Sequence, residues 1–204
     1  MPSQAIIIGV TGGVGAGKSE FSRMSECIGA SVVDADIVAR NMIEKNQTIQ
    51  SNLRKAFGDD IFSEDGQLFR QKLGRIVFSD PLKLQRLNQI TCAPLQSAVE
   101  ENIQKLKNTF PYIILDMAIL FETGFDALCN HVVFIKASEK RRIEWIHKQR
   151  GWTPEEIQNR IHSQTPEQIY ADQADTVIVN DSDLPSFREA AERFYIQFKS
   201  ENPV

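Results

Sequence analysis

The sequence predicts an α/β fold, in which a parallel β-sheet is flanked by helices and interrupted by a helical insertion. Short apolar runs alternate with helical segments along the chain, which is the pattern of a parallel sheet. A glycine-rich turn joins the first apolar run to a helix, as in phosphate-binding α/β proteins. The stretch 37–109 shows helical periodicity without a convincing strand, which predicts the insertion.

Strands and helices are expected at specific places. Residues 5–10, with three consecutive isoleucines, predict a buried first strand. Further strands are predicted at 31–33, 112–116, 131–135 and 176–179, and helices at 18–28, 138–150 and 185–199. Another helix begins after Thr153, because Thr153 can cap it, Pro154 suits its first turn and Glu156 occupies the capping-box position.

The composition argues against several classes of function. The formal net charge of −4 disfavours a general nucleic-acid or membrane-surface binder, since both partners reward basic surfaces. The three cysteines are widely spaced, which predicts the reduced thiols of a cytoplasmic protein rather than disulfides or a metal site. Residues 1–4 carry no basic side chain, so we expect no signal peptide. No apolar stretch approaches the roughly 20 residues that a membrane-spanning helix needs.

The glycine-rich turn is typical of a loop that binds the phosphates of ATP. Its pattern, Gly-x-x-x-x-Gly-Lys-Ser, lies between a predicted buried strand and a predicted helix, where backbone N–H groups can converge on phosphate oxygens. Lys18 adds a cation for the β- and γ-phosphates, and Ser19 offers a hydroxyl to Mg²⁺. A glycine-rich turn with a surface lysine is the alternative, which this context disfavours. The loop residues are Gly12, Gly13, Val14, Gly15, Ala16, Gly17, Lys18 and Ser19.

Glu20 is an unusual neighbour for a phosphate loop. Phosphate would repel its carboxylate unless the side chain points away from the nucleotide. We therefore expect only the backbone N–H of Glu20 to contribute to ATP binding. The sequence by itself does not explain why a carboxylate stands there.

Carboxylates follow two of the predicted strands. Asp34 and Asp36 are two residues apart, so in an extended chain their side chains point the same way, into the crevice at the strand ends. One of them can accept a proton from a substrate hydroxyl. Alternatively, Asp34 caps a helix that starts at Ile37, and both carboxylates are simply solvated. Asp116 ends the strand 112–116 and can hold Mg²⁺ through water.

Basic residues gather between 136 and 160. Arg150 is singled out because Gly151 follows it, so that it ends a helix at a mobile loop, where a closing lid carries its arginines. Such a cation would stabilise the transferring phosphoryl group. The other basic residues of this stretch are Lys136, Lys140, Arg141, Arg142, Lys148 and Arg160, and we expect most of them to lie on a solvated face.

Several further segments accompany these features in a fixed order. They are residues 9–19, residues 33–36 with Arg40, Leu115 and Asp116 with Leu120, Phe121 and Glu122, then Arg150, Arg160, Gln164 and residues 174–180. Together they resemble the dephospho-CoA kinases, a family of P-loop small-molecule kinases. The resemblance runs from about residue 5 to residue 182, and so covers nearly the whole chain.

The resemblance implies transfer of the ATP γ-phosphate to the ribose 3′-hydroxyl of dephospho-CoA, the last step of coenzyme A biosynthesis. It implies one kinase domain (1–204) with a P-loop core at 1–36, 110–138 and 173–204, a helical CoA-binding insertion at 37–109 and a lid at 139–172. We expect a monomer or a weak homo-oligomer without nucleic-acid or membrane partners.

On the family pattern, Asp36 takes the proton of the 3′-hydroxyl. Lys18 and Arg150 stabilise the transferring phosphoryl group, Ser19 ligates Mg²⁺, and Asn180 lies near the adenine of ATP. The substrate-binding residues that the resemblance implies are Asp34, Asp36, Arg40, Asp116, Phe121 and Glu122.

The chain departs from this pattern at three places. Cys92 and Ala93 stand where a His-Pro pair is usual, Ala118 stands where a proline is usual, and Ile146 replaces an arginine often found one turn before the lid arginine. Cys92 removes a hydrogen-bonding ring from the acceptor side. Two alternatives stay open: another P-loop kinase that acts on a nucleoside or nucleotide, and an ATP-binding homologue with impaired catalysis.

Overall fold

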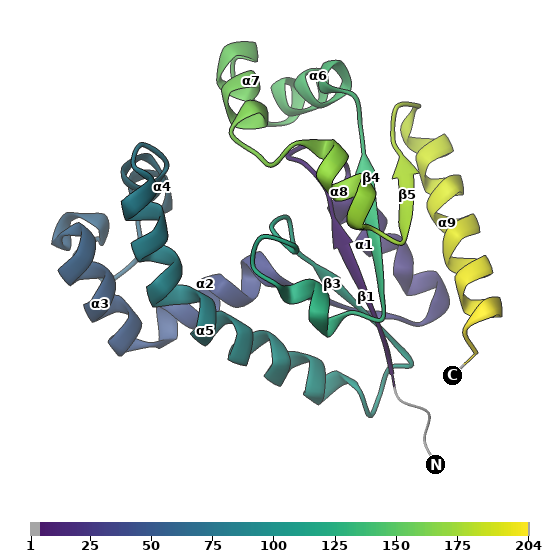
Figure 1. Cartoon of the computed structure of the whole chain (residues 1–204), viewed down its shortest axis with the longest axis horizontal. Helices are drawn as coiled ribbons and strands as arrows, with labels where there is room; N and C mark the ends of the chain where they lie inside the picture. Colours follow the sequence, from purple (N-terminus) through teal and green to yellow (C-terminus); the bar gives the residue numbers. More distant parts are fainter. Residues whose placement is uncertain (1–4, 204) are drawn as a thin grey trace. The chain divides into compact units, whose positions relative to one another are not determined.

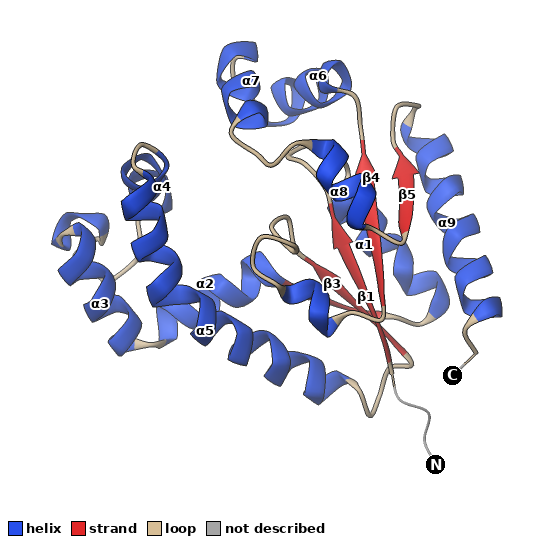
Figure 2. Cartoon of the chain, viewed as in Figure 1, coloured by secondary structure: helices blue, strands red, loops and turns tan. Residues whose placement is uncertain are grey.

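The computed structural model describes residues 5–203, so residues 1–4, for which we expect no signal peptide, and residue 204 lie outside the described part. Five parallel strands form one sheet in the order β2-β3-β1-β4-β5, drawn in red in Figure 2. The predicted parallel sheet is therefore confirmed. The strands are β1 (Ile6–Thr11), β2 (Ser31–Asp34), β3 (Tyr112–Asp116), β4 (His131–Lys136) and β5 (Thr176–Val179).

The chain divides into two compact units. One comprises Met1–Asp34 and Ile103–Val204 and contains the sheet, and the other is Ala35–Asn102. The sheet unit also carries α1 (Lys18–Met24), α6 (Glu139–Arg150), α7 (Pro154–His162), α8 (Glu167–Gln173), α9 (Leu184–Glu201) and two 3₁₀ turns, η1 (Ser25–Ile28) and η3 (Phe125–Leu128). The helix predicted over 18–28 is thus α-helical only to Met24, and it continues as the 3₁₀ turn η1.

Successive side chains of the strands point to opposite faces of the sheet, and helices pack on both faces. Ile8 of β1 and Ile135 of β4 belong to a core that they share with Phe21 of α1 and with residues of α9. On the opposite face, Phe134 of β4 stacks on Tyr170 of α8, with ring centroids 5.4 Å apart, and α8 lies across β4 in Figure 1. Both faces are covered by helices, which explains why the strands read as continuous apolar runs.

Two helices of the sheet unit, α6 and α7, lie beyond the carboxyl end of β4 (Figure 1). They pack on each other through a small apolar core made by Ile146, Ile157 and Ile161. The start of α7 has the predicted capping box, in which Thr153 accepts from the backbone of Glu156 and the Glu156 carboxylate accepts from the backbone of Thr153. This local prediction is confirmed.

The unit Ala35–Asn102 is helical, as the periodicity predicts. A single isolated bridge between Phe62 and Leu68 is its only β-pairing among the described residues. Its elements are α2 (Ala35–Lys45), α3 (Gln47–Phe57), the 3₁₀ turn η2 (Asp59–Ile61), α4 (Arg70–Phe78) and α5 (Pro81–Leu106). A separate core holds it together, formed by Ile43, Ile49, Leu53, Ile61, Phe62, Leu73, Val77 and Ile90. In the described residues, no helix combines the length and apolar character that crossing a membrane requires.

Candidate functional site

The predicted phosphate loop connects the end of β1 to the start of α1. The backbone N–H of Ala16 donates to the Gly13 carbonyl at 3.1 Å and closes a turn within the loop. Gly17, just before α1, has φ +103°, a backbone conformation that L-residues with a side chain rarely adopt. A Cβ atom there would also lie 2.5 Å from Nδ2 of Asn180. The strand–loop–helix context that the motif requires is therefore present.

Two polar side chains of the motif stand at the start of α1. Lys18 folds back over the loop, and its ammonium group donates to the Gly12 carbonyl at 3.2 Å. Ser19 is exposed on the first turn of α1, so its hydroxyl is open to solvent. Both side chains can therefore meet a ligand that enters the loop.

Two carboxylates lie at the carboxyl edge of the sheet. Asp116 ends β3, is 9% exposed, and accepts a hydrogen bond of 2.8 Å from the Ser22 hydroxyl of α1. Asp34 ends β2 and is the register partner of Asp116, while Val10 of β1 pairs with Asp116 on the other side. Parallel pairing thus aligns these carboxylates with the strand that enters the phosphate loop.

The prediction that Asp34 and Asp36 share one direction on an extended chain is wrong. Helix α2 begins at Ala35, two residues earlier than the expected start at Ile37. Asp34 is therefore the last residue of a strand, whereas Asp36 stands in the first turn of a helix. The two residues belong to different elements, so the alternation of side chains along a strand does not relate their directions.

Within the helical unit, Asp36 and Arg40 stand one turn apart on α2 and are exposed. Partial burial, and next the like charge of Arg40, lower the pKa of Arg70 at the start of α4. Glu44 and Asp36 act on Arg70 in the opposite direction. Arg70 thus joins Asp36 and Arg40 in one electrostatic cluster. The sequence analysis missed it, because Arg70 is 30 positions beyond Arg40 and only tertiary packing brings α4 to α2.

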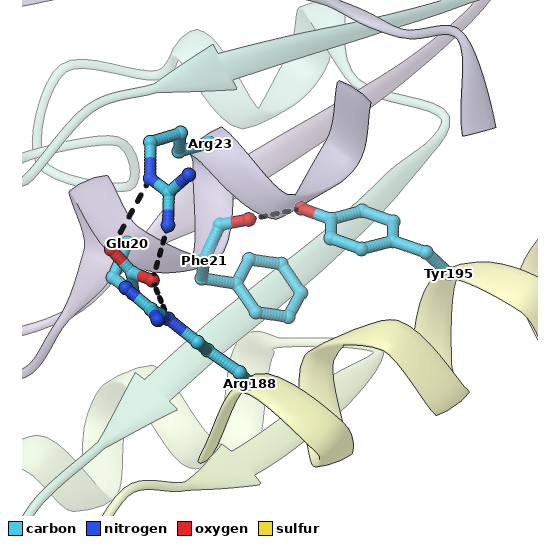
Figure 3. Close-up of polar contacts among 5 residues, drawn as sticks. All are labelled: Glu20, Phe21, Arg23, Arg188 and Tyr195. Carbon is cyan, nitrogen blue, oxygen red and sulfur yellow. Dashed lines mark hydrogen bonds and ion pairs between the residues drawn. The ribbon is translucent and has the colours of Figure 1, made fainter. Parts of the chain in front are cut away.

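Glu20 has two arginine partners, drawn in Figure 3. Its carboxylate contacts Arg23 of the same helix at 2.7 Å and Arg188 of α9 at 2.5 Å. The hydrogen bond from Arg23 is the largest cause that lowers the pKa of Glu20, and the bond from Arg188 adds to it. The neighbouring Phe21 carbonyl accepts from the Tyr195 hydroxyl at 3.0 Å. The ion pairs with Arg23 of α1 and Arg188 of α9 therefore explain why a carboxylate stands next to the phosphate loop.

Asn180 ties the end of the last strand to the phosphate loop. Its side-chain amide donates to the Ala16 carbonyl at 2.8 Å, and its backbone N–H donates to the Lys136 carbonyl at 2.7 Å. Asn180 thus touches the loop itself. Its predicted place near the adenine of ATP stays a prediction.

Arg150 is the last residue of α6, where the sequence places it. Gly151 caps the helix in the left-handed region, with φ +66°. The guanidinium groups of Arg150 and Arg160 each lie 5.2 Å from the ring centroid of Trp152. Trp152 is therefore a platform for two cations as well as a packing residue.

Arg142 is an exception among the basic residues of this stretch, because it is only 4% exposed. Its guanidinium lies 2.9 Å from the Glu167 carboxylate of α8 and beside Gly13 of the phosphate loop. Ile146, where the resemblance suggests an arginine, is buried and packs against Gly15. No sequence signal separates Arg142 from its basic neighbours, because its burial depends on α8 and on the loop.

Phe121 and Glu122, the remaining predicted substrate-binding residues of this unit, contact the segment around α8. The Glu122 carboxylate accepts from the Thr165 hydroxyl at 2.8 Å and from the Tyr170 hydroxyl. The Phe121 ring centroid is 6.0 Å from that of Tyr170. Burial, and next the bond to Glu122, raise the pKa of Tyr170, so this hydroxyl remains a donor.

Comparison with known proteins gives a consistent assignment. The dephospho-CoA kinase family model matches residues 6–186. A dephospho-CoA kinase of Oryza sativa subsp. japonica is 38% identical over 184 residues, which cover 90% of this chain and 80% of the relative. A dephospho-CoA kinase of Bacillus anthracis is 34% identical over 182 residues, which cover 88% of this chain and 90% of the relative.

Solved structures agree in fold. The crystal structure of TT1252 from Thermus thermophilus superposes with a TM-score of 0.82 at 27% identity, covering 99% of this chain and 100% of that one. Dephospho-CoA kinase from Campylobacter jejuni gives a TM-score of 0.70 at 22% identity, covering 96% and 98%, which shows the shared fold. A shikimate kinase from Bacteroides thetaiotaomicron shares the architecture more distantly. Its TM-score is 0.52 at 11% identity, covering 95% of this chain and 98% of that one.

Proposed function

This chain belongs to the dephospho-CoA kinase family, and on that premise we propose that it transfers the γ-phosphate of ATP to the ribose 3′-hydroxyl of dephospho-CoA, the last step of coenzyme A biosynthesis. The observation that carries the proposal is an intact phosphate loop between β1 and α1 in a chain that matches the family model over residues 6–186. The products are CoA and ADP.

The donor side rests on the residues around the loop. Lys18 reaches over the loop to the Gly12 carbonyl, from where its ammonium can turn to phosphate oxygens. Arg150 ends α6 beside the glycine hinge Gly151, which suits a cation on a lid that closes over the phosphates. We assign both to stabilisation of the transferring phosphoryl group, and Asn180 to the neighbourhood of the adenine.

We propose acceptor-binding residues in each of the two units, and assign them unit by unit. Asp36 is exposed in the first turn of α2, and we assign it as the base that takes the 3′-hydroxyl proton. Arg40 and Arg70, which share its electrostatic cluster, suit the phosphates of the acceptor. In the sheet unit, we assign acceptor binding to Asp34, Asp116, Phe121 and Glu122. The insertion 37–109 would bind the CoA moiety, and 139–172 would form the lid over the core.

We also propose that Mg²⁺ accompanies ATP, held by the Ser19 hydroxyl and, through water, by Asp116. Oxygen donors of this kind suit a hard cation. Ser19 is exposed at the start of α1, and Asp116 presents a carboxylate at the end of β3. When bound with ATP, the ion neutralises charge on the phosphate oxygens.

The direct test is turnover of purified protein with ATP, Mg²⁺ and dephospho-CoA, followed as ADP release and as CoA by mass spectrometry. We expect the product to carry its new phosphate on the ribose 3′-hydroxyl. Chromatography separates this product from the 2′ isomer. A panel of nucleosides and nucleotides serves as the comparison. Preferred turnover of any of these would favour the wider class of P-loop kinases, and ATP binding without turnover would favour a catalytically impaired homologue.

The base assignment has its own test. Asp36→Asn should lower kcat by about 100-fold or more, because a positioned base contributes on the order of 10²–10⁴ in rate, while the Kd for ATP stays near that of the wild type. Glu64→Gln, a matched loss of charge at an exposed position of the same unit outside α2, should leave kcat unchanged. Wild-type turnover in Asp36→Asn would refute the role.

We propose a cytoplasmic enzyme, a location that suits the three free cysteines. We also propose a monomer or a weak homo-oligomer, which light scattering across a concentration series can test. A concentration-independent dimer mass would contradict the second proposal.

A further inference from the structure

Arg142 is the only lysine or arginine that is buried among residues 5–203. Its side chain is 5% exposed, and it projects from α6, two turns before the proposed lid cation Arg150. Its neighbours Lys140 and Glu144 on the same helix are exposed. Burying a guanidinium costs free energy, so the groups that contact it indicate the role of Arg142.

Two groups surround the Arg142 guanidinium. Nη2 lies 2.9 Å from Oε1 of Glu167 in α8. Among the described residues Oε1 has no hydrogen-bond partner, so this contact is a close ion pair without the direction of a hydrogen bond, and Nε of Arg142 has no such partner either. Nη1 faces Gly13 of the phosphate loop, where a Cβ atom would lie only 2.2 Å from it. The absence of a side chain at Gly13 therefore permits the approach.

The two loop residues that follow Gly13 also contact the segment between α6 and α8. The Val14 N–H donates to Oε1 of Gln164, which precedes α8, at 3.0 Å. The Val14 side chain packs against the core that contains Ile146, and Ile146 itself packs against Gly15. Three consecutive loop residues, 13 to 15, thus touch the segment that runs from α6 to α8.

Folding stability alone does not require this arrangement. Replacing a buried ion pair with apolar side chains of similar volume is often neutral or stabilising, so a charged pair is not needed to pack α6 on α8. Arg142 instead keeps a positive charge and a rigid planar group against the loop that would carry the triphosphate. With 5% of its side chain exposed, it acts through the loop rather than on the ligand directly.

We propose that Arg142 is a positioning residue for phosphoryl transfer, which braces the first turn of the phosphate loop at Gly13 and is itself held by Glu167. The inference rests on the proposed function for its kinetic consequence. Its binding consequence, tighter binding of ATP, requires only that the loop holds a triphosphate.

The main variant is Arg142→Met, which keeps most of the stem and removes the charged fork. We expect the KM for ATP to rise about tenfold or more and kcat to fall, while the KM for dephospho-CoA stays within about twofold. Arg142→Lys keeps the charge and should recover part of the loss. Arg193→Met, which removes an exposed arginine paired with Glu189 on α9, is the matched control and should leave both constants unchanged.

The double variant Arg142→Met/Glu167→Met guards against a failure to fold, because it replaces the whole buried pair with apolar side chains. We expect it to fold with a wild-type melting temperature or higher and yet to show the raised KM for ATP. A merely structural role predicts the reverse, namely a lowered melting temperature in Arg142→Met and unchanged KM in the double variant. Wild-type KM for ATP and kcat in the double variant would overturn the proposal.

Calorimetric titration with ATP alone separates this inference from the proposed function. If the wild type does not phosphorylate dephospho-CoA, the proposed function fails, but weaker ATP binding in the two Arg142→Met proteins would still support the brace. If the wild type is active and ATP binds all variants equally, the brace fails and the proposed function stands.

Discussion

Gly17→Ala should damage the phosphate loop for two separate reasons, which the structure allows us to weigh. The residue has φ +103°, so a side chain there carries left-handed strain of about 1–2 kcal/mol. The new Cβ would also lie 2.5 Å from Nδ2 of Asn180 and displace its bond to the Ala16 carbonyl. That hydrogen bond is worth about 0.5–1.5 kcal/mol.

Together these costs amount to about 1.5–3.5 kcal/mol, and the conformation of the ATP-free loop decides whether they lower stability or ATP affinity. If the loop keeps its conformation, the free energy of unfolding falls by that amount. If the loop relaxes, it must return to this conformation when ATP binds, and the affinity for ATP falls by about 10- to 300-fold instead. The loss of unfolding free energy measured under saturating ATP contains both contributions.

Chemical denaturation with and without saturating ATP, combined with calorimetric titration of ATP, measures both parts. Gly29→Ala is the matched control, because Gly29 has φ +76° and no neighbour within 4 Å of the new Cβ. It should lose about 1–2 kcal/mol from strain and leave ATP affinity unchanged. In Asn180→Ala, the same Gly17→Ala change should cost less. Wild-type stability and ATP affinity in Gly17→Ala would refute this reasoning.

Two further predictions concern stability. Bonds from Arg23 and Arg188 hold the folded pKa of Glu20 below its usual 4.5, so this carboxylate stabilises the fold above pH 4.5 and the contribution is lost as the pH falls through the folded pKa. The difference in unfolding free energy between the wild type and Glu20→Gln should therefore shrink in acid, and a difference that grows below pH 4.5 would show that the sign is wrong. Thr153→Ala removes the capping box of α7 and should cost about 0.5–2 kcal/mol in thermal unfolding, whereas Thr109→Ala, outside any helix, should cost less. Equal melting temperatures for Thr153→Ala and the wild type would contradict the predicted cap.

Much of the fold could be predicted because its signals are local. Consecutive β-branched residues set the strand around Ile7, and Gly151 and Thr153 mark a helix end and a helix start by their own backbone chemistry. Asp36 shows where local reasoning stops. The strand rule was carried two residues too far, because the helix begins at Ala35, directly after Asp34, whereas the alternative of a helix capped by Asp34 placed its start at Ile37.

The candidate site likewise has one part that the local sequence predicts and one part that it does not. Its phosphate loop could be found from residues 12–19, since spacing and glycine content within eight residues determine that geometry. The residues around the loop could not, because their roles depend on partners far along the chain. Val14 meets Gln164 150 positions later, and Glu20 meets Arg188 168 positions later. Arg70 and Arg142 likewise read as ordinary surface arginines.

The sequence alone therefore determined the class of sheet, the phosphate loop at Gly12 to Ser19 and the family resemblance, because each is written in short-range order along the chain. Only the tertiary structure decided which charges are buried, paired or open. It placed Arg142 against Gly13, and it gave Glu20 its second arginine on α9. The physical reason is that the energy of a charge depends on the solvent and partners around it, and those are set by packing between distant segments.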